Sequence, residues 1–330
     1  MRFRLALLYA LIGFPGGSAE PQSTAKTAPL SAECAGLNQE ATERIAQGRS
    51  AEVERLLSLK VVNPGGAGPV CTGLVANNIA ARLLISGRLA DAERMALRSV
   101  RAFETGFSSD DPVLLRPLQI LAASRFEQGK IGEARQAFRR MEAVQTTRPQ
   151  DRWIVQGMAG ALLAAEGKLP EAESELVTAL EMLHQCGLGQ SADAGALLAG
   201  LSTIYIRERR IPEALRLLDQ ASAVFADAAE ADPWDHVKLL HTRGALHGRQ
   251  GQWKEAEQDL ADALALADRE SRVEPAALRD MLMDYAKALR KNHRRSEAQS
   301  IERRLATLGG YSQHSAVVDV SDLLARPKAR

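Results

Sequence analysis

Aromatic residues are scarce in this sequence. Seven Phe, three Trp and four Tyr make up 4% of the 330 residues, whereas apolar residues as a whole make up 45%. A core so poor in rings must be built mainly from Leu and Ala, and a core of that kind favours closely packed helices over β-sheet. The sequence therefore predicts an all-α protein.

An excess of charge of one sign is also missing. There are 42 basic and 41 acidic residues, so the formal net charge is +1. Nothing in that balance favours nucleic acid or an acidic membrane surface as a partner. The apolar fraction in turn excludes disorder over most of the chain.

Long hydrophobic runs are limited to the N-terminus, where apolar residues extend from Leu5 to Phe14 behind two arginines. This run is shorter than the ~20 residues that a membrane span requires. Small residues follow at Gly17 and Ala19, which is typical of a secretory signal peptide over residues 1–19 that is cleaved after Ala19. We therefore expect a secreted or periplasmic protein with no transmembrane span after signal removal. The alternatives are an uncleaved anchor and a cytoplasmic chain with a chance apolar start.

Motifs of catalysis and of metal binding are missing too. The sequence contains no His-Glu-x-x-His, and its six histidines show no metal-ligand spacing. The Gly-x-Ser-x-Gly elbow, the phosphate loop and the dinucleotide fingerprint are likewise absent. We predict a protein that is not an enzyme, with no cofactor, no metal and no small-molecule substrate evident.

What the sequence does contain is an internal repeat. Alanines recur at intervals of 42, 38, 42, 42 and 42 residues, at Ala92, Ala134, Ala172, Ala214, Ala256 and Ala298. Five residues before each stands a potential turn residue, namely Gly87, Gly129, Gly167, Arg209, Gly251 and His293. Glycine there suits the left-handed end of one helix, and Pro170 and Pro212 suit the first turn of the next. Each repeat is predicted to be a pair of helices.

A small residue also stands seven positions before each turn residue, as Ala80, Ala122, Gly160, Ser202, Gly244 and Ala286. Together, the small residue, the turn glycine and the alanine resemble the tetratricopeptide repeat. The usual period is about 34 residues, so this chain is similar to the longer variants of kinesin light chains and bacterial multi-repeat proteins. The resemblance implies a right-handed superhelical solenoid of stacked antiparallel helix pairs. Arg209 and His293 depart from the expected glycine.

The apolar N-terminal run and the repeats together give the predicted organisation of the chain. A signal peptide (1–19) and a flexible spacer (20–34) precede a degenerate capping hairpin (35–72), six repeats (73–307) and a C-terminal tail (308–330). Cys34 and Cys71 bracket the capping hairpin, and in an exported protein they are candidates for a disulfide, which would stabilise the cap by roughly 3–4 kcal/mol. The alternative is two small buried thiols.

The resemblance also implies a partner-binding groove lined by the first helix of each pair. The corresponding positions are Asn77, Gln119, Gly157, Ala161, Ala164, Ala199, Thr203, Ile206, His241, Lys287 and Arg290. Small and apolar residues between Gly157 and Ile206 would leave room for a helix or an extended segment of another protein. Equally, they would permit tight packing between repeats and nothing more. The predicted function is a protein–protein interaction scaffold that binds a protein or peptide.

The C-terminal end is basic, with ten basic and four acidic residues from Lys287 to Arg330. This supports an alternative function, in which a cytoplasmic regulator senses a peptide or contacts an acidic partner or nucleic acid through that end. The simpler interpretation is the soluble polar cap that terminal repeats require.

Overall fold

The computed structural model describes residues 32–47, 49, 52–53, 55–57, 68–85, 87–144, 149–228, 233–269 and 275–308. All regular elements in these ranges are helical, as predicted. The predicted signal peptide, nearly all of the spacer and nearly all of the C-terminal tail lie outside the described residues. No helix that the structure describes is long and apolar enough to cross a membrane.

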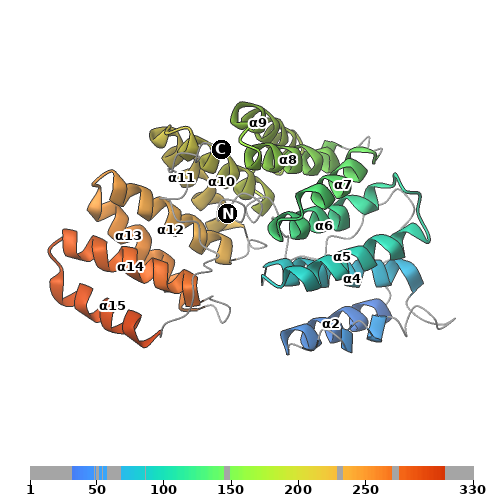
Figure 1. The fold of residues 1–330 in the computed structure, drawn as a ribbon, viewed down its shortest axis with the longest axis horizontal. Helices are drawn as coiled ribbons and strands as arrows, with labels where there is room; N and C mark the ends of the chain where they lie inside the picture. Colours follow the sequence, from blue (N-terminus) through green and yellow to red (C-terminus); the bar gives the residue numbers. More distant parts are fainter. Residues whose placement is uncertain are drawn as a thin grey trace. The chain divides into compact units, whose positions relative to one another are not determined.

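Helix α2 (Ala32–Ala46) is followed in the described chain by six pairs of helices (Figure 1). They are α4 (Gly68–Ile85) with α5 (Leu89–Glu104), α6 (Leu115–Glu127) with α7 (Ile131–Glu142), α8 (Pro149–Ala165) with α9 (Leu169–Gln185), α10 (Ala192–Arg207) with α11 (Ile211–Asp227), α12 (Pro233–Arg249) with α13 (Trp253–Ala267), and α14 (Pro275–Lys291) with α15 (Arg295–Thr307). The short 3-10 helix η1 (Pro112–Leu114) leads into α6.

A left-handed residue ends the first helix of every pair. Gly87, Gly129, Gly167 and Gly251 have φ between 72° and 84°, and Arg209 and His293 have φ of 63° and 64°. The turn at Arg209 is closed like the glycine turns, because its amide donates to the Ile206 carbonyl and the Arg210 amide to the Tyr205 carbonyl. The two residues that depart from glycine therefore keep the turn, at a conformational cost of about 1 kcal/mol each.

The first and second helices of a pair cross closely at the predicted small residues. A Cβ atom added to Gly160 of α8 would lie 2.6 Å from Leu176 Cδ2 and 3.2 Å from the Ala172 carbonyl oxygen of α9. At Gly244 of α12, a Cβ would lie 2.8 Å from Leu260 Cγ and 3.3 Å from the carbonyl oxygen of Ala256 in α13. The small residue and the repeat alanine thus face one another across the crossing, which explains why both are small.

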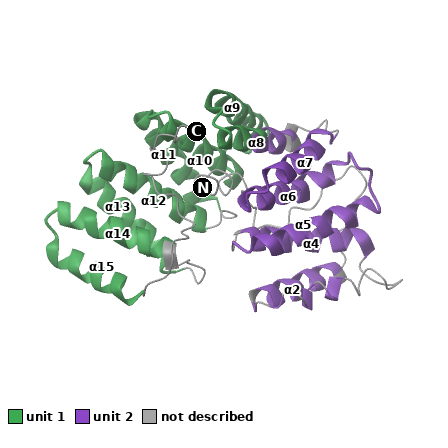
Figure 2. Ribbon diagram, in the orientation of Figure 1, with its two compact units in different colours: residues 1–16, 159–330 green, residues 17–158 purple. Residues whose placement is uncertain are grey.

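The helices fall into two compact units (Figure 2). Among the described residues, the N-terminal unit ends at Met158 and the C-terminal unit begins at Ala159, so the boundary lies within α8. This boundary falls in the one repeat whose turn glycines, Gly129 and Gly167, are 38 rather than 42 residues apart.

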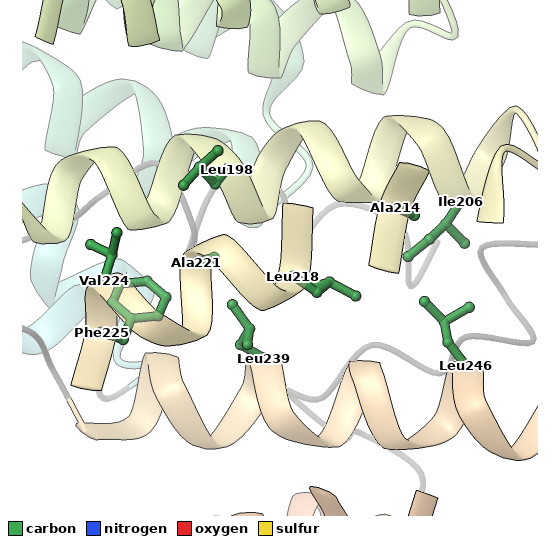
Figure 3. Packing of buried hydrophobic residues seen from close by; sticks show 9 residues of the cluster. All are labelled: Leu198, Ile206, Ala214, Leu218, Ala221, Val224, Phe225, Leu239 and Leu246. Atoms are coloured by element: carbon green, nitrogen blue, oxygen red, sulfur yellow. The ribbon is translucent and has the colours of Figure 1, made fainter. Parts of the chain in front are cut away.

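Helix α10 is buried over most of its surface, whereas α11 is buried along one stripe. In α10, buried side chains occur on all sides from Ala192 to Ile206, whereas the buried residues of α11 are Ala214, Leu218, Ala221, Val224 and Phe225. Figure 3 shows α11 packed between α10 and α12, with Leu198, Leu218 and Leu239 in one cluster. Burying a side chain of this size contributes about 1.5–3 kcal/mol.

At the N-terminal end, Cys34 of α2 and Cys71 of α4 form a disulfide, with their Cα atoms 5.7 Å apart. Leu37 and Ala41 of α2 are buried beside it. The bridge that the sequence left open is therefore present in the structure and holds α2 against the first helix pair.

Candidate partner-binding surface

The structure divides the predicted groove residues into buried and accessible ones. The buried ones are Gln119, Gly157, Ala161, Ala164, Thr203, Ile206 and His241. Asn77 and Ala199 are partly exposed, and Lys287 and Arg290 are exposed. A side chain without accessible surface cannot touch a partner directly, so the accessible part of the predicted groove is much smaller than expected.

Ile206 shows why the middle of the predicted groove is buried. It is 0% exposed and belongs to the same cluster as Leu218 of α11 and Leu246 of α12 (Figure 3). Its place in the cluster shows that it contacts neighbouring helices and not solvent. Ala161 and Ala164 are also fully buried, at 0% and 1% exposure. These three residues therefore pack between helices, as the second interpretation of the sequence had it, and they do not line an open groove.

The three buried polar members of the set all have hydrogen-bond partners within the protein. Thr203 Oγ1 donates to the Ala199 carbonyl oxygen of its own helix at 3.1 Å. Gln119 Oε1 accepts a hydrogen bond from Arg116 Nη1 at 3.3 Å, and the Arg116 guanidinium carbon lies 4.9 Å from the centroid of the Trp153 ring. In the C-terminal unit, His241 Nε2 lies 3.0 Å from Asp284 Oδ2. The Arg116–Trp153 and His241–Asp284 contacts join first helices of neighbouring repeats, namely α6 with α8 and α12 with α14.

A second set of polar residues, which sequence reasoning missed, joins consecutive repeats near their turns. Glu93 of α5 accepts hydrogen bonds from Arg125 Nε at 2.9 Å, Gln128 Nε2 at 2.9 Å and Lys130 Nζ at 2.7 Å. Burial by itself raises the pKa of Glu93, but these three donors outweigh it and hold the pKa at about 2. The carboxylate therefore stays charged within the protein at neutral pH.

The same arrangement recurs in every second repeat. Glu173 accepts hydrogen bonds from Tyr205 Oη at 2.6 Å and Arg210 Nη1 at 3.1 Å. Glu257 accepts from Asn292 Nδ2 at 2.6 Å and also pairs with Arg294. Burial and the hydrogen bond to Glu173 both raise the pKa of Tyr205, which keeps its hydroxyl protonated as a donor.

A sequence signal for these clusters exists. Glu93, Glu173 and Glu257 each stand six residues after a turn residue. The basic partner of each glutamate lies 37 residues further along the chain, directly after the turn residue of the next repeat; these partners are Lys130, Arg210 and Arg294. The two intervening repeats have Arg135 and Leu215 at the same position. The contacts hold neighbouring repeats together, and we assign them no chemistry.

Among the residues that the structure describes, no group of three or more His, Cys, Asp and Glu side chains could hold a metal ion. The accessible groove residues are instead concentrated on α14. Lys287 and Arg290 are exposed there together with Met283, whose exposed fraction of 53% is large for an apolar side chain. This face is the best-defined candidate for contact with a partner.

Comparison with known proteins agrees with the fold. Residues 238–269, which cover most of α12 and all of α13, match a family model described as the tetratricopeptide repeat. No curated protein matches the sequence. Two solved structures are similar over most of their length, although both are too distant in sequence to show more than the fold.

One is the crystal structure of BtubC (BKLC) from P. vanneervenii, whose sequence is 16% identical to this one. The two structures have a TM-score of 0.54, and the match covers 71% of this chain and 98% of that chain. The apo form of RapI is 11% identical, with a TM-score of 0.53 over 84% of this chain and 97% of that chain. These likenesses show the fold alone, an all-α array of stacked antiparallel helix pairs. The sequence match to the tetratricopeptide repeat covers the α12–α13 pair, and for this pair it agrees with the resemblance noted in the sequence.

Proposed function

We propose that this protein is an exported, non-catalytic scaffold that binds a segment of another protein along the accessible side of its first helices. Tetratricopeptide repeats suggest protein–protein interaction as the general role. The observation that carries the proposal is the regular recurrence of the helix pairs, whose turn residues lie 42 residues apart in four of five intervals. Repeated pairs place equivalent side chains in a row, and a row of this kind suits an extended or helical partner segment.

Partner binding is tested by substituting partly exposed positions on first helices of the C-terminal unit. Ala199 of α10 and Ala245 of α12 are partly exposed, and we would replace both with Arg. The matched control replaces Gln220 of α11 and Gln258 of α13 with Arg, because these exposed residues lie on second helices and gain the same charge. Each protein would serve as bait for affinity capture from an envelope extract, with circular dichroism and urea unfolding as checks on the fold.

We expect a protein that is captured by the parent and by the control but lost with Ala199→Arg/Ala245→Arg. Equal capture by all three baits would contradict binding along the first helices. Export is tested separately by mass spectrometry of the N-terminus, since a chain that begins at Glu20 supports cleavage after Ala19. A chain that begins at Met1 would favour the cytoplasmic regulator as the alternative.

A further inference from the structure

The exposed face of α14 combines cationic and apolar side chains. Met283, Lys287, Arg290 and Lys291 lie at i, i+4, i+7 and i+8, a spacing that places them along one side of a helix. All four side chains are exposed. Met283 is also one of three large apolar side chains that are exposed in the described part of the chain, with Val70 and Leu188.

Lys287 and Lys291 gather around one aromatic ring. The Nζ atom of each lies 5.7 Å from the centroid of the Trp253 ring. Two like charges four residues apart on a helix repel each other. The ring face offsets part of that repulsion through cation–π attraction but carries no negative charge. The structure therefore holds two ammonium groups close together without neutralising them.

The neighbouring arginines differ from this pair. Arg290 pairs with Glu302, Arg294 with Glu257 and Glu297, and Arg304 with Asp268. Lys287 and Lys291, in contrast, form no ion pair with any described residue. The positive charge of this face is thus concentrated on the two lysines.

Trp253 is held in place by the residues around it. It is the first residue of α13, and a Cβ added to Gly248 of α12 would lie 3.2 Å from the ring. Asn292 Nδ2 donates a hydrogen bond to the Trp253 carbonyl oxygen at 2.8 Å, which ties the end of α14 to the start of α13. The ring and the helix that carries the two lysines are consequently joined to one another.

We propose that this face of α14 binds an acidic protein segment, with carboxylates on Lys287 and Lys291 and an apolar side chain on Met283. The two unneutralised ammonium groups are complementary to closely spaced carboxylates. The flexible thioether of Met283 adapts to apolar side chains of different shape, and a nucleic-acid backbone offers no such group. This inference rests on the proposed function, because it takes the partner to be a protein.

The test uses fluorescently labelled peptides and the full mature chain. The probe consists of repeated Asp-Glu-Leu triplets, the neutral control of Asn-Gln-Leu triplets, and the control without apolar side chains of Asp-Glu-Ser triplets. An oligothymidylate serves as a polyanion of another class. Binding is measured by fluorescence anisotropy near physiological salt, where the screening length is about 8 Å.

The matched variants separate this site from general charge. Lys287→Glu/Lys291→Glu removes the lysine pair, and Arg295→Glu/Arg303→Glu makes the same change of charge at exposed residues of α15. We expect the first to weaken Asp-Glu-Leu binding by about tenfold or more, and the second to change it less than twofold. Met283→Ser and the Asp-Glu-Ser peptide should each weaken binding several-fold.

Equal losses in the two charge variants, or equal binding of the neutral peptide, would overturn the proposal. So would absence of binding, or binding of Asp-Glu-Ser or oligothymidylate as tight as that of Asp-Glu-Leu, which would indicate a polyanion site. The two proposals can fail separately. If capture depends on Ala199 and Ala245 while the acidic peptide does not bind, the scaffold function stands and the acidic partner is wrong.

Discussion

The two ends of the described helix array are stabilised by different means. At the N-terminal end, the buried residues among the described side chains of α2 are Cys34, Leu37 and Ala41, and the Cys34–Cys71 disulfide joins this helix to α4. At the C-terminal end, Ala298 is the buried residue of α15, and Arg294 and Arg304 connect this end to Glu257 and Asp268 on the preceding pair. Among the described helices, α2 packs mainly on α4 and α15 mainly on α14, so each buries little apolar surface. One end compensates with a covalent bond and the other with ion pairs.

Removal of the disulfide should give the largest effect. Cys34→Ser/Cys71→Ser opens a loop with a sequence separation of 37 residues, and we expect it to destabilise the cap by about 3–4 kcal/mol. Hydrogen exchange of α2 amides measures this loss, with reduced parent protein as a second route to the same state. Unchanged protection of α2 would show that packing of Leu37 and Ala41 is sufficient.

Acid should weaken the ion clusters and leave the disulfide intact. The pKa of Glu93 is lowered to about 2 in the folded protein, below the ordinary value of 4.5. Its contribution to the free energy of unfolding is therefore complete above pH 4.5 and is lost as the pH falls through about 2. The shift corresponds to about 3 kcal/mol, of which we expect about 2 kcal/mol because solvent screens this partly exposed cluster. Urea unfolding between neutral pH and pH 2 measures it. Glu93→Gln should reduce the slope in that window, and an identical slope would contradict the prediction.

Loss of the Glu257 carboxylate, which binds residues near the C-terminal end, should destabilise the protein less than loss of the Glu93 charge. Glu257→Ala removes the partner of Asn292 and Arg294, but Asn292 retains the Trp253 carbonyl and Arg294 retains Glu297. We expect destabilisation by about 1 kcal/mol, seen first as faster hydrogen exchange in α15. Glu255→Ala, an exposed change on the same helix, is the control. Equal effects of the two substitutions would argue that Glu257 does not hold this end.

A glycine at the last turn should stabilise the C-terminal end slightly. His293 has φ of 64°, which disfavours a side chain, so His293→Gly removes strain. The greater freedom of glycine in the unfolded chain opposes this gain, and we expect a net stabilisation of about 0.5 kcal/mol. Thermal unfolding measures the change, and His293→Ala should destabilise instead. A loss of stability with glycine would mean that the imidazole makes a contribution of its own.

Much of the fold could be predicted because its determinants are local. The turn positions follow from residues five apart, and Arg209 and His293 adopt the same left-handed turn although they break the glycine pattern. The crossings at Gly160 and Gly244 were also predictable, since a small residue at a fixed offset has little other purpose. For Cys34 and Cys71 the sequence left a disulfide and two buried thiols as alternatives, because the distance between the two sulfur atoms depends on how α2 packs on α4.

The candidate site was predicted less well. The offsets from the family pattern identified Lys287 and Arg290, which are exposed, but also Ile206 and Ala161, which are buried. Periodicity shows which side of a helix a residue occupies, but not how closely the next repeat approaches that side. The carboxylate clusters were missed for a related reason, since their signal is a pair of positions in different repeats.

By itself, the sequence determined the helical class, the length of the repeats, the place of each turn and the small residues at each crossing, because all of these depend on backbone conformation and contacts within one helix pair. Only the tertiary structure decided which groove positions are accessible, which carboxylates join neighbouring repeats, and that Lys287 and Lys291 share the ring of Trp253. Those properties depend on the spacing between side chains of different helix pairs, which follows from the packing of whole repeats and is not encoded in any one of them.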